Sequence, residues 1–124
     1  MEKPQTKQGI ARIINAFKYS RNGLLACYRN EEAFRQESIM FIILLPVIIL
    51  IPVAPVLKLF LFTANSLVLI VELLNSAIEA VVDKVSPEFH TLAERAKDMG
   101  SAAVLLSLIL AGVVWAAAVF DLLF

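Results

Sequence analysis

Charged residues, glycine and cysteine are all scarce in this chain of 124 residues. Only 18% of the residues are charged, and 11 basic side chains balance 11 acidic ones, which removes the electrostatic basis for nucleic-acid binding. The single cysteine, Cys27, excludes an intrachain disulfide. Among the 4 glycines there is neither a G-x-x-x-x-G-K-[ST] nor a G-x-G-x-x-G pattern, so a P-loop and a protein-kinase cleft are excluded. Residues 1–37 lack the apolar stretch of a secretory signal.

Hydrophobic residues, by contrast, make up 60% of the chain and give it a mean hydropathy of +0.80. Residues 38–57, 59–71 and 101–120 contain no charged side chain. A helix needs about 20 residues to cross the hydrocarbon core of a bilayer, and Pro52 and Pro55 mark a turn. The sequence therefore predicts a single all-α membrane domain over 1–124, with transmembrane helices at about 33–51, 57–83 and 93–120.

Basic residues are distributed unevenly around these predicted spans. Seven of the 11 lie before the first span or in its first turn, at positions 3, 7, 12, 18, 21, 29 and 35. Lys84, Arg95 and Lys97 lie between the second span and the first turns of the third. The turn between the first two spans has only Lys58. By the positive-inside rule, we expect a cytoplasmic N-terminus and a C-terminus outside.

An amphipathic helix is expected before the first span, at about residues 5–29. Apolar side chains recur at helical spacing along one face, at Ile10, Ile13, Ile14, Phe17, Leu24 and Leu25. Such a helix lies on the membrane surface with its apolar side down. Gly23 is a candidate interruption of this helix.

The second span has a polar face. At about 100° per residue, its polar side chains fall within an arc of roughly 100°, with Asn65 added about two turns earlier; they are Glu72, Asn75, Ser76, Glu79 and Asp83. An ionised carboxylate below the headgroups is costly unless it is paired or hydrated, which favours a functional role. The alternative is a polar clamp between helices.

A second polar arc opens the third span and contains Glu94, Lys97, Asp98 and Ser101. Carboxylates from two segments, with a lysine nearby, suit the binding of a magnesium nucleotide, because magnesium takes few protein oxygens and keeps its phosphate ligands. The alternative for this arc is a structural role, in which its charged side chains form ion pairs at the start of the helix. A solvated helix start is the alternative for Glu31 and Glu32, and simple exposure is the alternative for His90.

These motifs resemble those of one family, the prokaryotic diacylglycerol kinases. Residues 72–83 match E-x-x-N-[ST]-A-I-E-x-x-x-D, and residues 96–103 match A-K-D-x-x-[AS]-[AG]-A. Asn30-Glu31, residues 33–37, Tyr19-Ser20 and Gly23-Leu24 complete the pattern. The resemblance implies a homotrimer of three-span subunits in the bacterial inner membrane, with the C-terminus periplasmic. It also implies transfer of the ATP γ-phosphate to diacylglycerol, giving phosphatidic acid at the cytoplasmic interface.

The resemblance further implies a role for each matching position. Glu72 would be the general base on the lipid hydroxyl, and Glu31 and Glu79 would hold Mg²⁺. The nucleotide would contact Arg12, Tyr19, Glu31, Glu79, Glu88, His90, Lys97 and Asp98. The lipid substrate would contact Arg12, Ser20, Ala33, Arg35, Glu72 and Ser101. Asn75 and Asp83 would support the site.

Two features leave alternatives open. Arg21 stands where several members have a tryptophan, so the lipid contact of the surface helix at this position is open. Separately, a Gram-positive branch of the same fold phosphorylates undecaprenol instead. Arg95 and Met99-Gly100-Ser101 resemble the diacylglycerol branch more closely. An undecaprenol kinase is therefore the alternative enzyme. A polar-lined channel or assembly factor is the non-enzymatic alternative.

Overall fold

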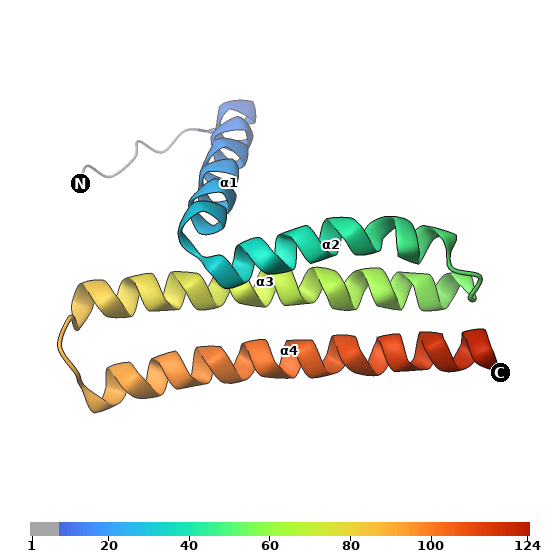
Figure 1. The fold of residues 1–124 in the computed structure, drawn as a ribbon. Helices are drawn as coiled ribbons and strands as arrows, with labels where there is room; N and C mark the ends of the chain where they lie inside the picture. The colour runs from blue at the N-terminus through green and yellow to red at the C-terminus, as the bar shows by residue number, and fades with distance from the viewer. Residues whose placement is uncertain (1–7) are drawn as a thin grey trace.

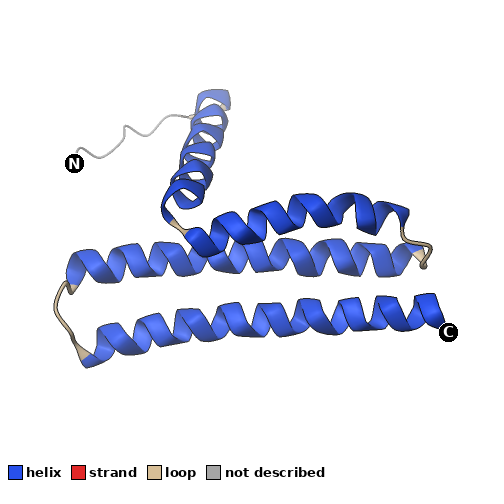
Figure 2. Cartoon of the chain, viewed as in Figure 1, coloured by secondary structure: helices blue, strands red, loops and turns tan. Residues whose placement is uncertain are grey.

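The structure, a computed structural model, describes residues 8–124, and within that range every regular element is an α-helix (Figure 1; Figure 2). The elements are α1 (Ile10–Asn30), α2 (Glu32–Leu50), α3 (Pro55–Val85) and α4 (Thr91–Leu123). The last three are long and apolar enough to cross a membrane. The predicted all-α fold with three spans is confirmed.

The ends of the helices differ slightly from the expected ranges. Helix α1 begins after Gln8 and Gly9, so the prediction that these two residues are helical is wrong. Residues 5–7 of the predicted helix lie outside the described range. Gly23 does not interrupt α1, since one isolated glycine costs a helix only about 1 kcal/mol. Both α3 and α4 extend two or three residues beyond each end expected for the second and third spans.

Helix α3 is the central element of an antiparallel bundle and packs against both α2 and α4 (Figure 1). In the first half of α3, buried side chains form two apolar clusters, one around Leu61 and one around Val68. Between them, the Trp115 indole N–H donates to Asn65 Oδ1 at 3.4 Å, linking α4 to α3. Most of the remaining large apolar side chains face outward, as expected of helices surrounded by lipid.

The three bundle helices differ in length, and the difference lies at one end. Helix α2 has 19 residues, α3 has 31 and α4 has 33, which correspond to about 28, 46 and 50 Å at 1.5 Å per residue. Only α2 matches a hydrocarbon core of about 30 Å. Because residues 51–54 join α2 closely to α3, the extra length of α3 and α4 projects at the other end, toward residues 86–90 (Figure 1).

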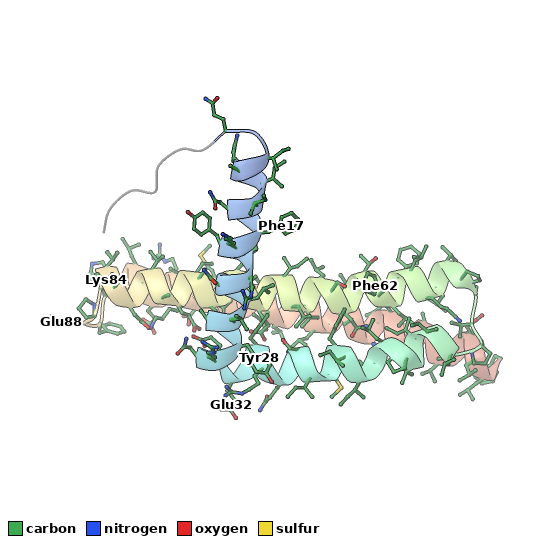
Figure 3. All side chains as sticks on the ribbon, turned by 90° about the horizontal axis from the view of Figure 1, so that it is seen from above. Phe17, Tyr28, Glu32, Phe62, Lys84 and Glu88 are labelled. Atoms are coloured by element: carbon green, nitrogen blue, oxygen red, sulfur yellow. The ribbon has the colours of Figure 1, made fainter. Side chains whose placement is uncertain are left out.

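Helix α1 leaves the bundle crosswise, starting from the corner where α2 begins (Figure 1; Figure 3). Glu31 forms this corner with an extended backbone (φ −116°, ψ 110°). The Arg35 guanidinium donates to the carbonyl oxygens of Tyr28 and Arg29, at 3.0 and 3.3 Å, and so fastens the end of α1 to α2. Farther along α1, apolar side chains such as Phe17 are exposed (Figure 3). This arrangement suits a helix that lies on a bilayer surface while the other three cross it.

Candidate functional site

A buried carboxylate lies close to the corner where α1, α2 and α3 meet. The side chain of Glu72, on α3, is only 6% exposed and is the one buried charged group among residues 8–124. Three further carboxylates lie within electrostatic range of it: Glu31 at the corner, Glu37 on α2 and Glu79 on α3. The structure therefore gathers acidic side chains from three different parts of the chain. We call these four residues the carboxylate cluster.

Asn75 connects the carboxylate cluster to α4. Its Nδ2 donates to Glu79 Oε1 at 3.4 Å, which fixes how the amide is turned. Its Oδ1 is buried, and no donor in the described part of the chain reaches it. This oxygen faces the backbone of Gly100, which is itself buried. Asn75 therefore fills the space between Glu79 and α4.

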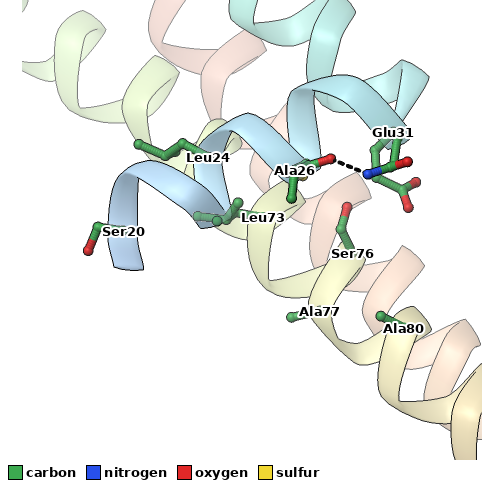
Figure 4. A pocket seen from close by; sticks show the side chains of 11 residues that line it. Ser20, Leu24, Ala26, Glu31, Leu73, Ser76, Ala77 and Ala80 are labelled. Carbon is green, nitrogen blue, oxygen red and sulfur yellow. Dashed lines mark hydrogen bonds between the residues drawn. The ribbon is translucent and has the colours of Figure 1, made fainter. Parts of the chain in front are cut away.

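A groove of about 520 Å³ runs between α1 and α3 beside the cluster (Figure 4). It is lined mainly by small or apolar side chains, with a few polar groups: Ser20, Gly23, Leu24, Ala26, Cys27, Asn30, Glu31, Leu73, Ser76, Ala77 and Ala80. Small side chains on both walls keep the groove open. Its apolar walls end at Glu31, so it suits a ligand with an apolar body and a polar head.

Cys27, in the wall of this groove, is a buried free cysteine. Burial raises the pKa of the Cys27 thiol, nearby Glu31 and Glu72 raise the pKa further, and a hydrogen bond with Ser76 partly opposes them. The thiol is therefore held neutral beside the acidic groups, as burial and negative neighbours require.

A second pocket, of about 310 Å³, lies where α3 ends and α4 begins. Lys97 and Asp83 form an ion pair across it. Predicted nucleotide-binding residues also line it, and these are Glu88, His90, Lys97 and Asp98. The His90 ring has a local structural role, because its Nδ1 accepts a hydrogen bond from the Leu92 backbone N–H at 3.1 Å and caps α4.

Glu79 lies between the buried Glu72 and the second pocket. It lies within electrostatic range of Glu72 on one side and of Lys97 on the other. The polar face predicted for the second span therefore continues along α3 from the carboxylate cluster to the second pocket. The cluster includes Glu37 near the start of α2. The second pocket is lined by residues at the ends of α3 and α4 that project beyond α2 (Figure 1).

Not every predicted site residue joins these two places within one chain. Arg12 and Tyr19 are exposed on the part of α1 that leaves the bundle (Figure 1). Ala33 and Ser101 are exposed and line neither pocket. Ser20 lines the groove of Figure 4, and Arg35 is engaged with backbone carbonyls at the corner.

The sequence analysis assigned no site role to Glu37 or Cys27, and it did not predict the contact between Gly100 and Asn75. The sequence signal for Glu37 was its place as the last charged residue before the first uncharged stretch. The other two had no signal of their own, because each depends on which face of a neighbouring helix lies opposite.

The donor set fits a magnesium ion shared with a nucleotide and does not fit a closed protein cage. Within residues 8–124, no three His, Cys, Asp or Glu side chains are grouped so as to hold a metal. Glu31, which precedes Glu72 in the sequence, and Glu79, which follows it, are both half-buried, and both lie within electrostatic range of Glu72. Magnesium commonly takes one or two protein carboxylates and completes its shell with phosphates and water. A cation would also offset the repulsion among the four carboxylates.

Comparison with known proteins gives consistent matches over nearly the whole chain. The family model for prokaryotic diacylglycerol kinase matches residues 18–119. The diacylglycerol kinase of Escherichia coli strain K12 is 48% identical over 107 residues, which cover 86% of this chain and 88% of that protein. The diacylglycerol kinase of Pseudomonas aeruginosa is 49% identical over 108 residues, covering 87% and 88%. That of Haemophilus influenzae is 40% identical over 112 residues, covering 90% and 95%.

Proposed function

The chain belongs to the prokaryotic diacylglycerol kinase family, and from this premise we propose that it transfers the ATP γ-phosphate to diacylglycerol, giving phosphatidic acid. It acts as a single-domain enzyme of the bacterial inner membrane. A kinase of this family takes ATP and diacylglycerol as substrates and uses a divalent metal, for which we propose Mg²⁺. The N-terminus and the α3–α4 loop face the cytoplasm, and the C-terminus faces the periplasm.

One observation carries the assignment of the site. Glu72 is buried among carboxylates, of which Glu31 lines the groove between α1 and α3 and Glu37 lies near the start of the shortest spanning helix. A lipid with a hydroxyl headgroup and a water-soluble nucleotide meet at this depth and nowhere else in a bilayer. A carboxylate that only clamped helices together would not need three acidic neighbours.

Glu72 acts as the general base. The diacylglycerol hydroxyl oxygen attacks the γ-phosphorus of ATP, the bond from that phosphorus to the β,γ-bridging oxygen breaks, and ADP leaves. The hydroxyl proton passes to the Glu72 carboxylate. Burial at the lipid end of the site keeps water from competing as acceptor, and the groove between α1 and α3 holds the acyl part of the substrate against Ser20 and its neighbours. Arg12, Ala33, Arg35 and Ser101 border the same lipid.

The nucleotide lies on the cytoplasmic side of Glu72. Glu31 and Glu79 would hold Mg²⁺, which when bound neutralises charge on the phosphates. The contacts to ATP come from Arg12, Tyr19, Glu88, His90, Lys97 and Asp98. Asp83 keeps Lys97 in place through their ion pair, and Asn75 keeps Glu79 in place through its amide.

The working form is a homotrimer with sites shared between copies. In one copy, Arg12 and Tyr19 are exposed on α1, a helix that runs crosswise to its own bundle (Figure 1). A second copy packed beside the first can receive them. The polar face of α3 is half-exposed in a single three-span subunit. In a trimer with shared sites, a neighbouring copy covers this face with protein in place of lipid.

Replacement of the base tests this function. We expect Glu72→Gln to lower the rate of phosphate transfer to diacylglycerol in mixed micelles by at least about 100-fold, the usual contribution of a general base. The matched control is Glu32→Gln, because Glu32 is exposed and its carboxylate accepts from Gln36 Nε2. An active Glu72→Gln enzyme would remove the base assignment.

The acceptor is identified by parallel assays with diacylglycerol and undecaprenol at equal mole fraction in the micelle. We expect turnover with diacylglycerol to exceed turnover with undecaprenol. The reverse preference would assign the chain to polyprenol phosphorylation. ATP consumption that no lipid alcohol stimulates would instead support a channel or assembly factor.

A further inference from the structure

We infer that Gly100 is a positioning residue for phosphate transfer, because the missing side chain at this point of α4 lets the Asn75 amide hold Glu79. The inference rests on the function proposed above and adds a residue from α4 to its metal-binding side. Gly100 would touch neither nucleotide nor lipid and would act only through Asn75.

The first step is the fit between the two helices. Gly100 is buried, and a Cβ atom built on it would overlap Asn75 Oδ1, while lying 3.3 Å from Asn75 Cγ and 3.9 Å from Asn75 Cβ. The bond from the Gly100 Cα to one of its hydrogens therefore points at the amide oxygen. Any L side chain at this position would occupy the place that the oxygen now has.

The second step is the orientation of the amide. Asn75 Nδ2 donates to Glu79 Oε1 at 3.4 Å, and Oδ1 is turned to Gly100 with no donor within reach in the described residues. Turning the amide over would place its oxygen against the Glu79 carboxylate, which is electrostatically unfavourable. The donor can face Glu79 only while the oxygen has room at Gly100, so the two contacts depend on each other.

The third step is what an added methyl group would do. The severe overlap involves only the last atom of a flexible side chain, and the atoms closer to the α3 backbone lie at 3.3 Å or more from the built Cβ. Rotation of the amide relieves the collision at less cost than separation of α3 and α4, which form the most extensive helix pair in the bundle. Gly100→Ala should therefore leave the fold in place and remove the Nδ2 donor from Glu79.

Glu79 without this donor would be less well held. Glu72 repels its carboxylate and Lys97 attracts it, so without the amide both charges draw Glu79 away from Glu72 and toward Lys97. A carboxylate that must meet a metal ion with a fixed geometry loses affinity when the group that orients it is lost, typically 10–100-fold. The effect of Gly100→Ala should therefore appear in the metal dependence of the reaction.

The experiment measures diacylglycerol phosphorylation against Mg²⁺ concentration at saturating ATP, for wild type, Gly100→Ala and Gly112→Ala. Gly112 is the matched control, since it lies on α4 with nothing within 4 Å of a built Cβ. We expect the Mg²⁺ concentration for half-maximal rate to rise about 10-fold or more in Gly100→Ala. We expect Gly112→Ala to match wild type, and all three to unfold at similar temperatures in detergent.

A double variant separates positioning from packing. In an Asn75→Ala background the colliding oxygen is gone, so adding Gly100→Ala should cause no further change in Mg²⁺ dependence. Additive effects would overturn the inference, and so would wild-type metal dependence in Gly100→Ala. An unfolded Gly100→Ala protein would also overturn it, since the collision would then have parted the helices. A wild-type protein inactive on diacylglycerol would instead refute the proposed function.

Discussion

Glu79 has an acidic neighbour, Glu72, on one side and a basic neighbour, Lys97, on the other. If it holds the metal ion, Glu79→Gln removes a charged ligand while keeping a side chain of the same size, and the Asn75 amide remains beside it. We expect the Mg²⁺ concentration for half-maximal activity to rise by about 10-fold or more. The assay varies Mg²⁺ at fixed ATP, with Glu32→Gln as the exposed control. A mutant with wild-type metal dependence would exclude Glu79 as a ligand.

The Cys27 thiol gives a second prediction for a single residue. Burial and the acidic neighbours raise its pKa, so at pH 7 to 8 less of it is thiolate than in a free cysteine, and the thiolate is the reactive form. We expect slow alkylation by a water-soluble maleimide, with the rate still rising above pH 9. The comparison is Thr91→Cys in a Cys27→Ala background, since Thr91 is exposed at the start of α4 and has no role in the proposed site. Equal rates at the two positions would show that Cys27 is not shielded.

Residues on one face of one helix were predictable, and residues that depend on a second helix were not. Glu72, Asn75 and Glu79 fall on one arc by helical spacing alone, and the structure places all three at the carboxylate cluster or in contact with it. Gly100 could be expected to permit close packing, but spacing within α4 does not reveal that Asn75 lies opposite. The approach of Glu37 to Glu72 likewise depends on how α2 packs on α3.

The pairing of α3 with α4 includes one polar link, from Trp115 to Asn65, within the apolar part of both helices. Asn65→Val keeps a side chain of similar size and leaves the indole N–H without its acceptor. Interhelical hydrogen bonds in membranes average about 0.6 kcal/mol and reach about 1.7, so we expect a loss of stability of that size with activity retained. Denaturation by increasing SDS in mixed micelles measures it. The control is Thr63→Val, because Thr63 is exposed on α3.

The three spanning helices could be predicted from hydropathy and turn residues, but the exact ends of α3 and α4 could not. Apolar length identified three spans, and Pro55 starts α3 as a proline at the first turn should. The ends of α3 and α4 extend beyond the expected limits because hydropathy marks only the part of a helix inside the lipid, and the helix can continue past that part. The projecting ends carry the Asp83–Lys97 ion pair, and four of the eight predicted nucleotide-binding residues line one pocket there: Glu88, His90, Lys97 and Asp98.

At the scale of the whole molecule, one copy holds the groove between α1 and α3 and the second pocket, but Arg12 and Tyr19 line neither. Sequence periodicity places Arg12 on a surface helix, and it does not say over which bundle that helix lies. The same limit applies to the trimer, which the resemblance implies and which a single chain does not test. The question becomes whether Arg12 serves its own copy or a neighbour.

Mixing two inactive variants answers it. If Arg12 reaches the site of a neighbouring copy, then Arg12→Gln and Glu72→Gln chains, unfolded together and refolded as an equal mixture, form some sites with both native residues. In a symmetric oligomer with random assembly this gives about one quarter of wild-type activity. Glu72→Gln mixed with Glu79→Gln is the control and should show only the residual activity of its Glu79→Gln chains, with no gain on mixing, because both residues lie on α3 of one chain. An Arg12 mixture that stays equally inactive would mean that each copy supplies its own Arg12, and the crosswise α1 would then have to turn back toward its own bundle to bind the nucleotide.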